Sequence, residues 1–142
     1  MAANSDKRIL VLLVEDNPAD VLFLREAVEA AGVAARLEVT TNGEDALRFL
    51  RRQPPFADAP RPDVIVMDLN VPVKNGKELL ADMMVEPALR MIPVAILTTS
   101  NSDGHLCDSY TPGRCVYFTK TADFERLQDC VRRIAAHAGA RD

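Results

Sequence analysis

The sequence predicts an α/β fold: an open, doubly wound sheet of five parallel strands with five helices on its two faces. Short runs rich in Val, Ile and Leu alternate along the chain with longer segments whose apolar residues recur at helical spacing. The short runs lack polar alternation, which is typical of strands buried on both faces. A length of 142 residues is sufficient for one domain with its own core.

Three strands are strongly indicated and two more weakly. Ile9–Val14, Asp63–Met67 and Val94–Leu97 are mostly continuous apolar runs, and we expect them at the centre of the sheet. Leu37–Thr41 and Cys115–Phe118 are weaker candidates and suit positions farther from the centre. The longest apolar run has six residues, whereas a membrane span needs about 20.

Five helices are expected between and after these strands. Pro18–Ala31 has Asn17 as its cap, a proline in its first turn and Gly32 at its end. Asp103–Tyr110 is the weakest helix, because Gly104 lies in its first turn and costs about 1 kcal/mol relative to alanine. The other three are Gly43–Arg52, Gly76–Glu86 and Ala122–Ala138.

A single domain is expected over residues 7–138. Residues 1–6 and 139–142 are small or polar, and we expect them to be flexible. The segment 53–62 contains four prolines. We interpret it as a long loop within the domain, because neither side of it could fold by itself.

The composition excludes several classes of protein. The chain has 17 Lys and Arg against 21 Asp and Glu, whereas a general nucleic-acid binder needs a surplus of basic residues. No cleavable leader or membrane span is indicated, so a cytoplasmic location is expected. The three cysteines are odd in number and include no Cys-x-x-Cys, so no framework of disulfides can be drawn. We expect Cys107, Cys115 and Cys130 to be buried thiols rather than ligands or nucleophiles.

Residues able to do chemistry follow four of the five predicted strands. Each one is weak by itself, since strand ends are exposed and often polar. The carboxyl ends of parallel strands lie at one edge of a sheet, where ligands bind in such folds. We therefore expect these residues to lie together: Glu15 and Asp16 after the first strand, Asp68 after the third, Thr98 and Thr99 at the end of the fourth, and Lys120 after the fifth.

Three carboxylates at one edge require a counter-charge. Two like charges about 4 Å apart repel by roughly 4 kcal/mol at an effective dielectric constant of about 20, so raised pKa values or a bound cation are expected. Oxygen ligands suit Mg²⁺, and without a thiolate or histidine pair zinc is disfavoured. Such a site could transfer a phosphoryl group to Asp68, with Mg²⁺ and Lys120 neutralising its charge and Thr98 donating a hydroxyl. The added charge could then act as a switch.

Three other functions are alternatives to a phosphoryl acceptor. A phosphatase of the aspartyl-phosphate type would need a second acid two positions after Asp68, where Asn70 stands. A flavin or nucleotide module would need a Gly- or hydroxyl-rich loop after the first strand, where Glu15 and Asp16 would repel phosphates. A phosphorylation-independent interaction domain remains the alternative; its usual mark would be loss of Asp68 or Lys120, and both are present.

Four stretches in this order resemble the receiver domain of two-component response regulators. The resemblance covers nearly the whole chain, about residues 7–138. The motifs Glu-Asp-Asn-Pro-Ala-Asp and Leu-Thr-Thr-Ser further resemble those of the stand-alone receivers that partner bacterial phytochromes. The four stretches are Val14–Pro18, Met67–Pro72 with Asn75-Gly76, Ile96–Ser100 and Tyr117–Lys120.

The resemblance implies a flavodoxin-like sheet with strand order 2-1-3-4-5 and a protein that is no conventional enzyme. It implies that a histidine kinase, in this subfamily a bacterial phytochrome, phosphorylates Asp68, and that output passes to a partner protein. A homodimer through the fourth and fifth helices is common in similar proteins. The implied Mg²⁺ ligands are Glu15, Asp16, Asp68 and the carbonyl of Asn70, with Asp16 the more direct of the acidic pair.

Three further roles follow from the same resemblance. Lys120 would bind the phosphoryl group, Thr98 would be the switch hydroxyl, and Tyr117 the aromatic side chain whose rotamer follows it. Tyr117 could equally be a half-buried aromatic residue of an edge strand. The sequence departs from many receivers at Thr121. In those receivers a proline follows the lysine, and the peptide bond between the two is cis. Before threonine a cis bond would cost about 2.5–4 kcal/mol, so we expect a trans bond.

Overall fold

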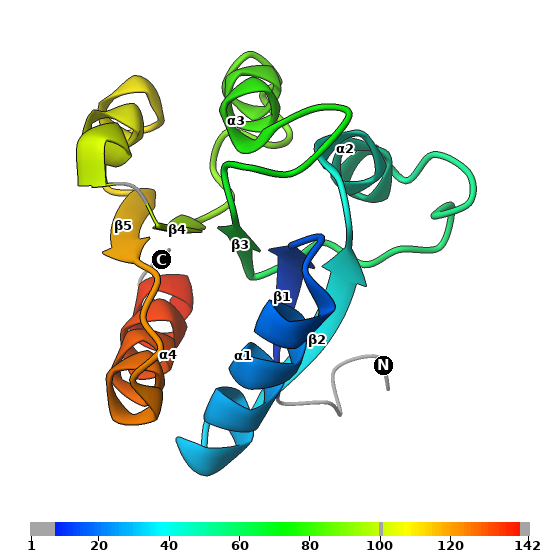
Figure 1. Cartoon of the computed structure of the whole chain (residues 1–142). Helices are drawn as coiled ribbons and strands as arrows, with labels where there is room; N and C mark the ends of the chain where they lie inside the picture. The colour runs from blue at the N-terminus through cyan, green and yellow to red at the C-terminus, as the bar shows by residue number, and fades with distance from the viewer. Residues whose placement is uncertain (1–7, 100, 140–142) are drawn as a thin grey trace.

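Five parallel strands form one sheet in the order β2-β1-β3-β4-β5, which confirms the predicted topology. The computed structural model (Figure 1) describes residues 8–99 and 101–139, and of residues 101–104 the backbone only. The expected flexible residues 1–6 and 140–142 lie outside the described residues. The strands are β1 (Ile9–Val14), β2 (Ala35–Thr40), β3 (Val64–Met67), β4 (Val94–Thr98) and β5 (Cys115–Thr119).

Helices cover both faces of the sheet. Figure 1 shows α1 (Pro18–Ala30) and α4 (Phe124–Gly139) side by side on one face, where the rings of Phe23 and Phe124 lie 5.5 Å apart. The opposite face carries α2 (Gly43–Arg51) and α3 (Gly76–Met84). Within the described residues, no helix has the length and apolar character that a membrane span requires.

The central strands are buried on both faces, as their composition predicts. Alternate side chains of each strand point to opposite faces. Leu12 and Ile65 pack under α2 and α3, whereas Val11 and Val66 pack under α1 and α4. The sheet therefore joins two apolar layers, which hold its carboxyl edge in a fixed position.

Local side-chain contacts set where the helices begin. The Asn17 side chain accepts hydrogen bonds from the main chain at the start of α1, as predicted. Asp123 accepts from the main-chain N–H groups of Glu125 and Arg126, so α4 begins at Phe124 rather than at residue 122. At its other end α4 extends to Gly139, which was expected to be flexible.

The fourth predicted helix is a 3-10 helix, η2 (Asn101–Ser109), and not an α-helix. Gly104 disfavours an α-helix here. Tyr110 is excluded from η2 and buried, and its hydroxyl lies 3.0 Å and 2.9 Å from the carbonyl oxygens of Leu89 and Ile92. The described chain therefore has four α-helices rather than five.

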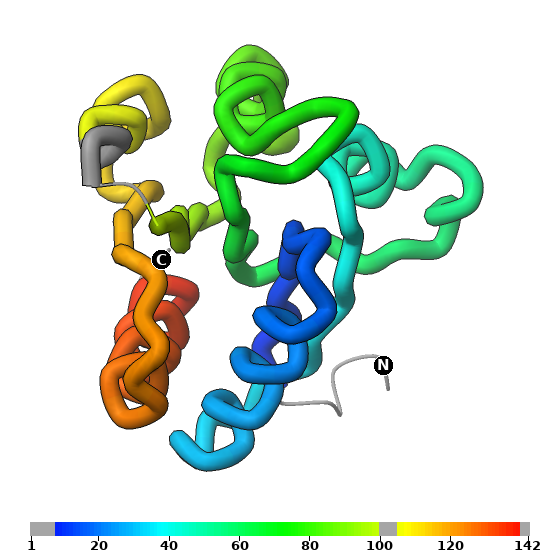
Figure 2. Tube along the Cα trace, in the orientation of Figure 1, coloured from blue at the N-terminus to red at the C-terminus, as the bar shows by residue number. Residues whose placement is uncertain are grey.

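The segment between α2 and β3 is the predicted long loop. It projects beyond α2 before returning to the sheet (Figure 2, teal). Phe56 ties the loop to the domain, because its ring lies 5.5 Å from that of Phe49. In the described residues a cis peptide bond joins Pro54 and Pro55, and the Lys120–Thr121 bond is trans as expected.

The prediction that all cysteines are free thiols is wrong for two of them. Cys107 of η2 and Cys115 of β5 form a disulfide, with 5.2 Å between their Cα atoms. The chain reverses between η2 and β5 and so brings the two cysteines together. An odd number of cysteines in the sequence does not indicate that two of them are paired. Cys130 is free and half-buried.

Alkylation tests the disulfide directly. The unreduced protein, unfolded in denaturant, should take up one alkyl group, at Cys130, and the reduced protein should take up three. Intact mass spectrometry measures both values. Three groups before reduction would show that the bond is absent.

The start of α2 leaves no room for a side chain at Gly43. Its N–H donates to the Lys74 carbonyl over 2.8 Å, and a Cβ atom would lie 2.0 Å from that oxygen. We expect Gly43→Ala to lower the free energy of unfolding by about 2 kcal/mol through overpacking. Denaturant titration measures this loss. Gly139→Ala is the control, because a Cβ there meets nothing within 4 Å; equal stability of both variants would contradict the prediction.

Candidate functional site

Main-chain hydrogen bonds extend past the strand ends and fix the residues that follow them. The N–H of Glu15 donates to Thr40 and that of Asp68 donates to Val14, each over 3.0 Å. The N–H of Lys120 donates to the Thr98 carbonyl over 2.7 Å. The sheet thus places the residues that follow β1, β3 and β5 at one edge.

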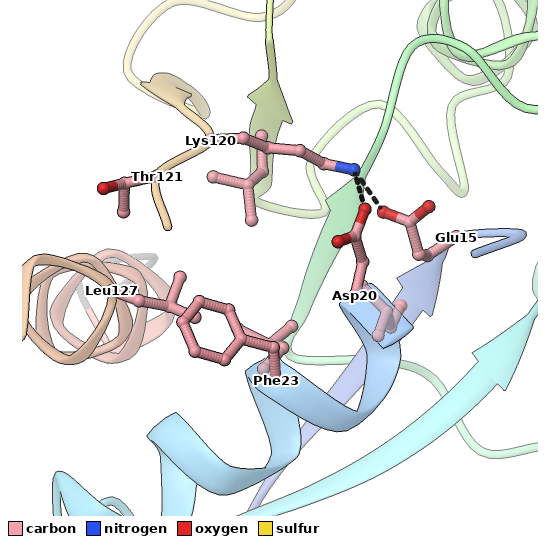
Figure 3. Close-up of a pocket in the computed structure, with 9 residues that line it drawn as sticks. Glu15, Asp20, Phe23, Lys120, Thr121 and Leu127 are labelled. Carbon is pink, nitrogen blue, oxygen red and sulfur yellow. Dashed lines mark hydrogen bonds and ion pairs between the residues drawn. The ribbon is translucent and has the colours of Figure 1, made fainter. Parts of the chain in front are cut away.

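The Lys120 ammonium lies at the centre of this edge. Its Nζ is 2.7 Å from Glu15 Oε1 and 2.8 Å from both Asp20 Oδ2 and Asp68 Oδ2. Figure 3 shows Lys120 reaching from the segment after β5 toward Glu15 and toward Asp20 at the start of α1. The exposed side-chain fraction is 5% for Glu15, 11% for Asp68, 17% for Lys120 and 42% for Asp20.

Burial and charge act in opposite directions on these groups. Burial raises the pKa of Glu15, although the hydrogen bond and the charge of Lys120 oppose that rise. Burial by itself would lower the pKa of Lys120, but its hydrogen bonds to Asp20, Asp68 and Glu15 outweigh burial and raise that pKa. With one ammonium against three carboxylates, the cluster remains negative and attracts a further cation.

Both oxygens of the Asp68 carboxylate have partners. Oδ2 accepts from Lys120, and Oδ1 accepts from the N–H of Asn70 over 3.0 Å. The loop that carries Asn70 is closely packed, because the Gly76 N–H donates to Leu69 and a Cβ at Gly76 would lie 2.8 Å from the Leu69 Cα. The Asp68 side chain is therefore held in one orientation, between the loop and Lys120.

The predicted metal ligands are only partly brought together. Glu15 and Asp68 point at Lys120, whereas Asp16 is exposed, and its carboxylate has no hydrogen bond or ion pair within the described part of the chain. No three Asp, Glu, His or Cys side chains of the described residues form a metal-holding group. The chemistry of the donors still fits Mg²⁺, because these carboxylates and the Asn70 carbonyl offer oxygen atoms and the cluster is negative.

The two predicted switch residues lie on neighbouring strands. Thr98 is fully buried at the end of β4, and its register partner on β5 is Thr119. Tyr117 lies two positions before Thr119, so its side chain is on the same face of the sheet as that of Thr98. The Tyr117 hydroxyl is buried and has no hydrogen-bond partner among the described residues.

Asp20 is the member of the site that the sequence analysis did not single out. It lies in the first turn of α1, which follows β1 at the carboxyl edge. The signal for it is its place in the first turn of the helix that follows β1, because that turn also lies at the carboxyl edge of the sheet. The sequence Glu-Asp-Asn-Pro-Ala-Asp contains three acidic residues, Glu15, Asp16 and Asp20. Their spacing does not indicate which of them reach Lys120.

Comparison with known proteins agrees with this geometry. Residues 11–132 match the family described as the response regulator receiver domain. Response regulator Rcp1 of Synechocystis sp. is 34% identical over 134 residues, which are 94% of this chain and 91% of Rcp1.

Two solved structures are also similar. The phosphorylated cyanobacterial phytochrome response regulator RcpA matches with a TM-score of 0.81 and 36% identity, covering 95% of this chain and 96% of RcpA. The Mn²⁺-bound form of Rcp1 matches with a TM-score of 0.77 and 34% identity, covering 90% of this chain and 92% of that one. The fold is thus shared with both of these proteins.

Removal of the central cation should destabilise the domain. Lys120→Met leaves Glu15 and Asp68 buried without their ammonium, which should lower the free energy of unfolding by roughly 3 kcal/mol. Denaturant titration in metal-free buffer measures the loss. Arg132→Met is a matched control, since it breaks an exposed ion pair with Asp129 and should cost less than about 0.5 kcal/mol. Similar losses in the two variants would contradict a structural role for Lys120.

Proposed function

The chain belongs to the response regulator receiver domain family, and from this premise we propose that it accepts a phosphoryl group on Asp68 from a histidine kinase. The family consists of phosphoacceptor signalling domains rather than conventional enzymes. The observation that carries the proposal is the buried Asp68 carboxylate, 2.8 Å from the Lys120 ammonium. A nucleophile and a fixed positive charge thus meet at the edge where ligands bind in this fold.

The transfer uses the two oxygens of Asp68. One carboxylate oxygen attacks phosphorus and forms the new O–P bond, while the P–N bond to the kinase histidine breaks and the imidazole keeps the electron pair. Lys120 neutralises charge on the phosphoryl oxygens as they arrive. The N–H of Asn70, 3.0 Å from Asp68 Oδ1, holds the carboxylate in place during this step.

Mg²⁺ is the cofactor that this site is proposed to use. The carboxylates of Glu15, Asp16 and Asp68 and the carbonyl of Asn70 would hold it. When bound, it supplies positive charge for the phosphoryl oxygens and offsets the repulsion between the carboxylates. The Mn²⁺-bound form of Rcp1 supports a divalent cation in such a site.

Thr98 and Tyr117 are proposed to convert phosphorylation into a change of surface. The hydroxyl of Thr98 would donate to a phosphoryl oxygen and move toward Asp68. Tyr117 would then enter the space that Thr98 leaves, since both side chains lie on one face of neighbouring strands. Its buried hydroxyl without a partner among the described residues supports this, because such a group gains from any move that supplies one.

The proposed partners follow from the relatives. RcpA is a cyanobacterial phytochrome response regulator, so a bacterial phytochrome is the proposed kinase. The signal would then pass to a downstream protein by direct contact. The proposed location is the cytoplasm, where such a kinase would meet its partner.

Mass spectrometry with a small phosphodonor tests the proposal. Incubation with Mg²⁺ should add one phosphoryl group to the wild type and none to Asp68→Asn, and chelation of the metal should abolish the gain. Glu44→Gln is a matched control, since it removes a partly exposed acid that pairs with Arg48 and not with Lys120, and it should be phosphorylated like the wild type. If the wild type gains no mass while a known receiver does, the phosphorylation-independent interaction domain replaces this proposal.

A further inference from the structure

We infer that Asp20 is a displaceable ligand of Lys120, which occupies the ammonium N–H that a phosphoryl oxygen takes during transfer. This inference rests on the proposed function and adds a positioning residue to it. Asp20 makes this contact from the first turn of α1, outside the strand ends that carry the other site residues.

All three N–H groups of the Lys120 ammonium are engaged in hydrogen bonds. An ammonium group has three N–H donors, and three carboxylates lie at 2.7, 2.8 and 2.8 Å from Nζ. These are the short distances of charge-assisted hydrogen bonds. A phosphoryl oxygen can therefore bond to Lys120 only if one of the carboxylates gives up its place.

Asp20 is the carboxylate that gives way most readily. The Glu15 side chain is 5% exposed, so it would remain a buried charge without its cation. Asp68, 11% exposed, is the nucleophile and has to stay beside Lys120 while it attacks phosphorus. The Asp20 side chain is 42% exposed, so water can replace the ammonium as its partner. Glu15 then keeps Lys120 beside Asp68 and the phosphoryl group.

The surroundings of Asp20 also suit a temporary ligand. Its carboxylate has Lys120 as its single partner among the described residues. It lies at the N-terminal end of α1, where the helix dipole favours a negative charge even without Lys120. Asp20 lines a cavity of about 50 Å³ together with the apolar side chains of Phe23 and Leu127 (Figure 3). The side chain is thus unconfined on that side.

Loss of the Asp20 charge should therefore accelerate phosphorylation. With a small phosphodonor, which needs no docking surface, Asp20→Asn should react roughly two- to fivefold faster than the wild type, as expected when a partly exposed ion pair no longer has to be broken. Asp20→Glu keeps a carboxylate and should restore a rate near that of the wild type. The gain should be similar for acetyl phosphate and for phosphoramidate, which is less negatively charged, because the competition is for Lys120.

A control variant in the same helix separates this inference from a general effect of charge. Glu26→Gln removes an exposed acid from the same helix and should leave the rate unchanged. Rates of Asp20→Asn at or below the wild-type rate, an equal gain in Glu26→Gln, or a gain confined to acetyl phosphate would each overturn the inference. A wild-type protein that takes up no phosphoryl group on Asp68 would instead overturn the proposed function, and the inference with it.

Discussion

The contact of one ammonium with three carboxylates is the interaction on which the site depends. Lys120 joins the ends of β1 and β3 and the start of α1 to the segment after β5. Without it, two buried carboxylates would face each other at the edge of the sheet. Because these residues are distant in sequence, the charge cluster can form only when β1, β3, β4 and β5 have paired. Fold and chemistry therefore depend on the same contact.

The strands and their carboxyl edge could be predicted because both follow from local patterns. Continuous runs of Val and Ile indicate buried parallel strands. The carboxyl ends of parallel strands lie at one edge of the sheet regardless of the conformation of the loops. This suffices to bring Glu15, Asp68 and Lys120 to one edge. The same logic fails for η2 and for the pair Cys107 and Cys115, since a 3-10 helix and a tight chain reversal depend on tertiary contacts that leave no periodic signal.

Within the site, sequence predicts which segments meet but not which side chains touch. Asp16 and Asp20 both lie near the start of α1, four positions apart, and their separation does not indicate which one reaches Lys120. That choice depends on how the first turn of the helix is oriented above the sheet. One contact that helps to hold this orientation is the packing of Phe23 against Phe124 of α4. The sequence shows each aromatic residue but not the contact between them.

The disulfide between Cys107 and Cys115 makes the region after Thr98 sensitive to the redox state of its compartment. Glutathione keeps most cytosolic cysteines reduced, and a reduced pair would release the covalent link between η2 and β5. The hydroxyls of Tyr110 and Thr111 would then still hold the returning chain to the carbonyls of Leu89 and Arg90. An oxidant would thus restrain the segment beside the switch residues without touching the acidic cluster itself.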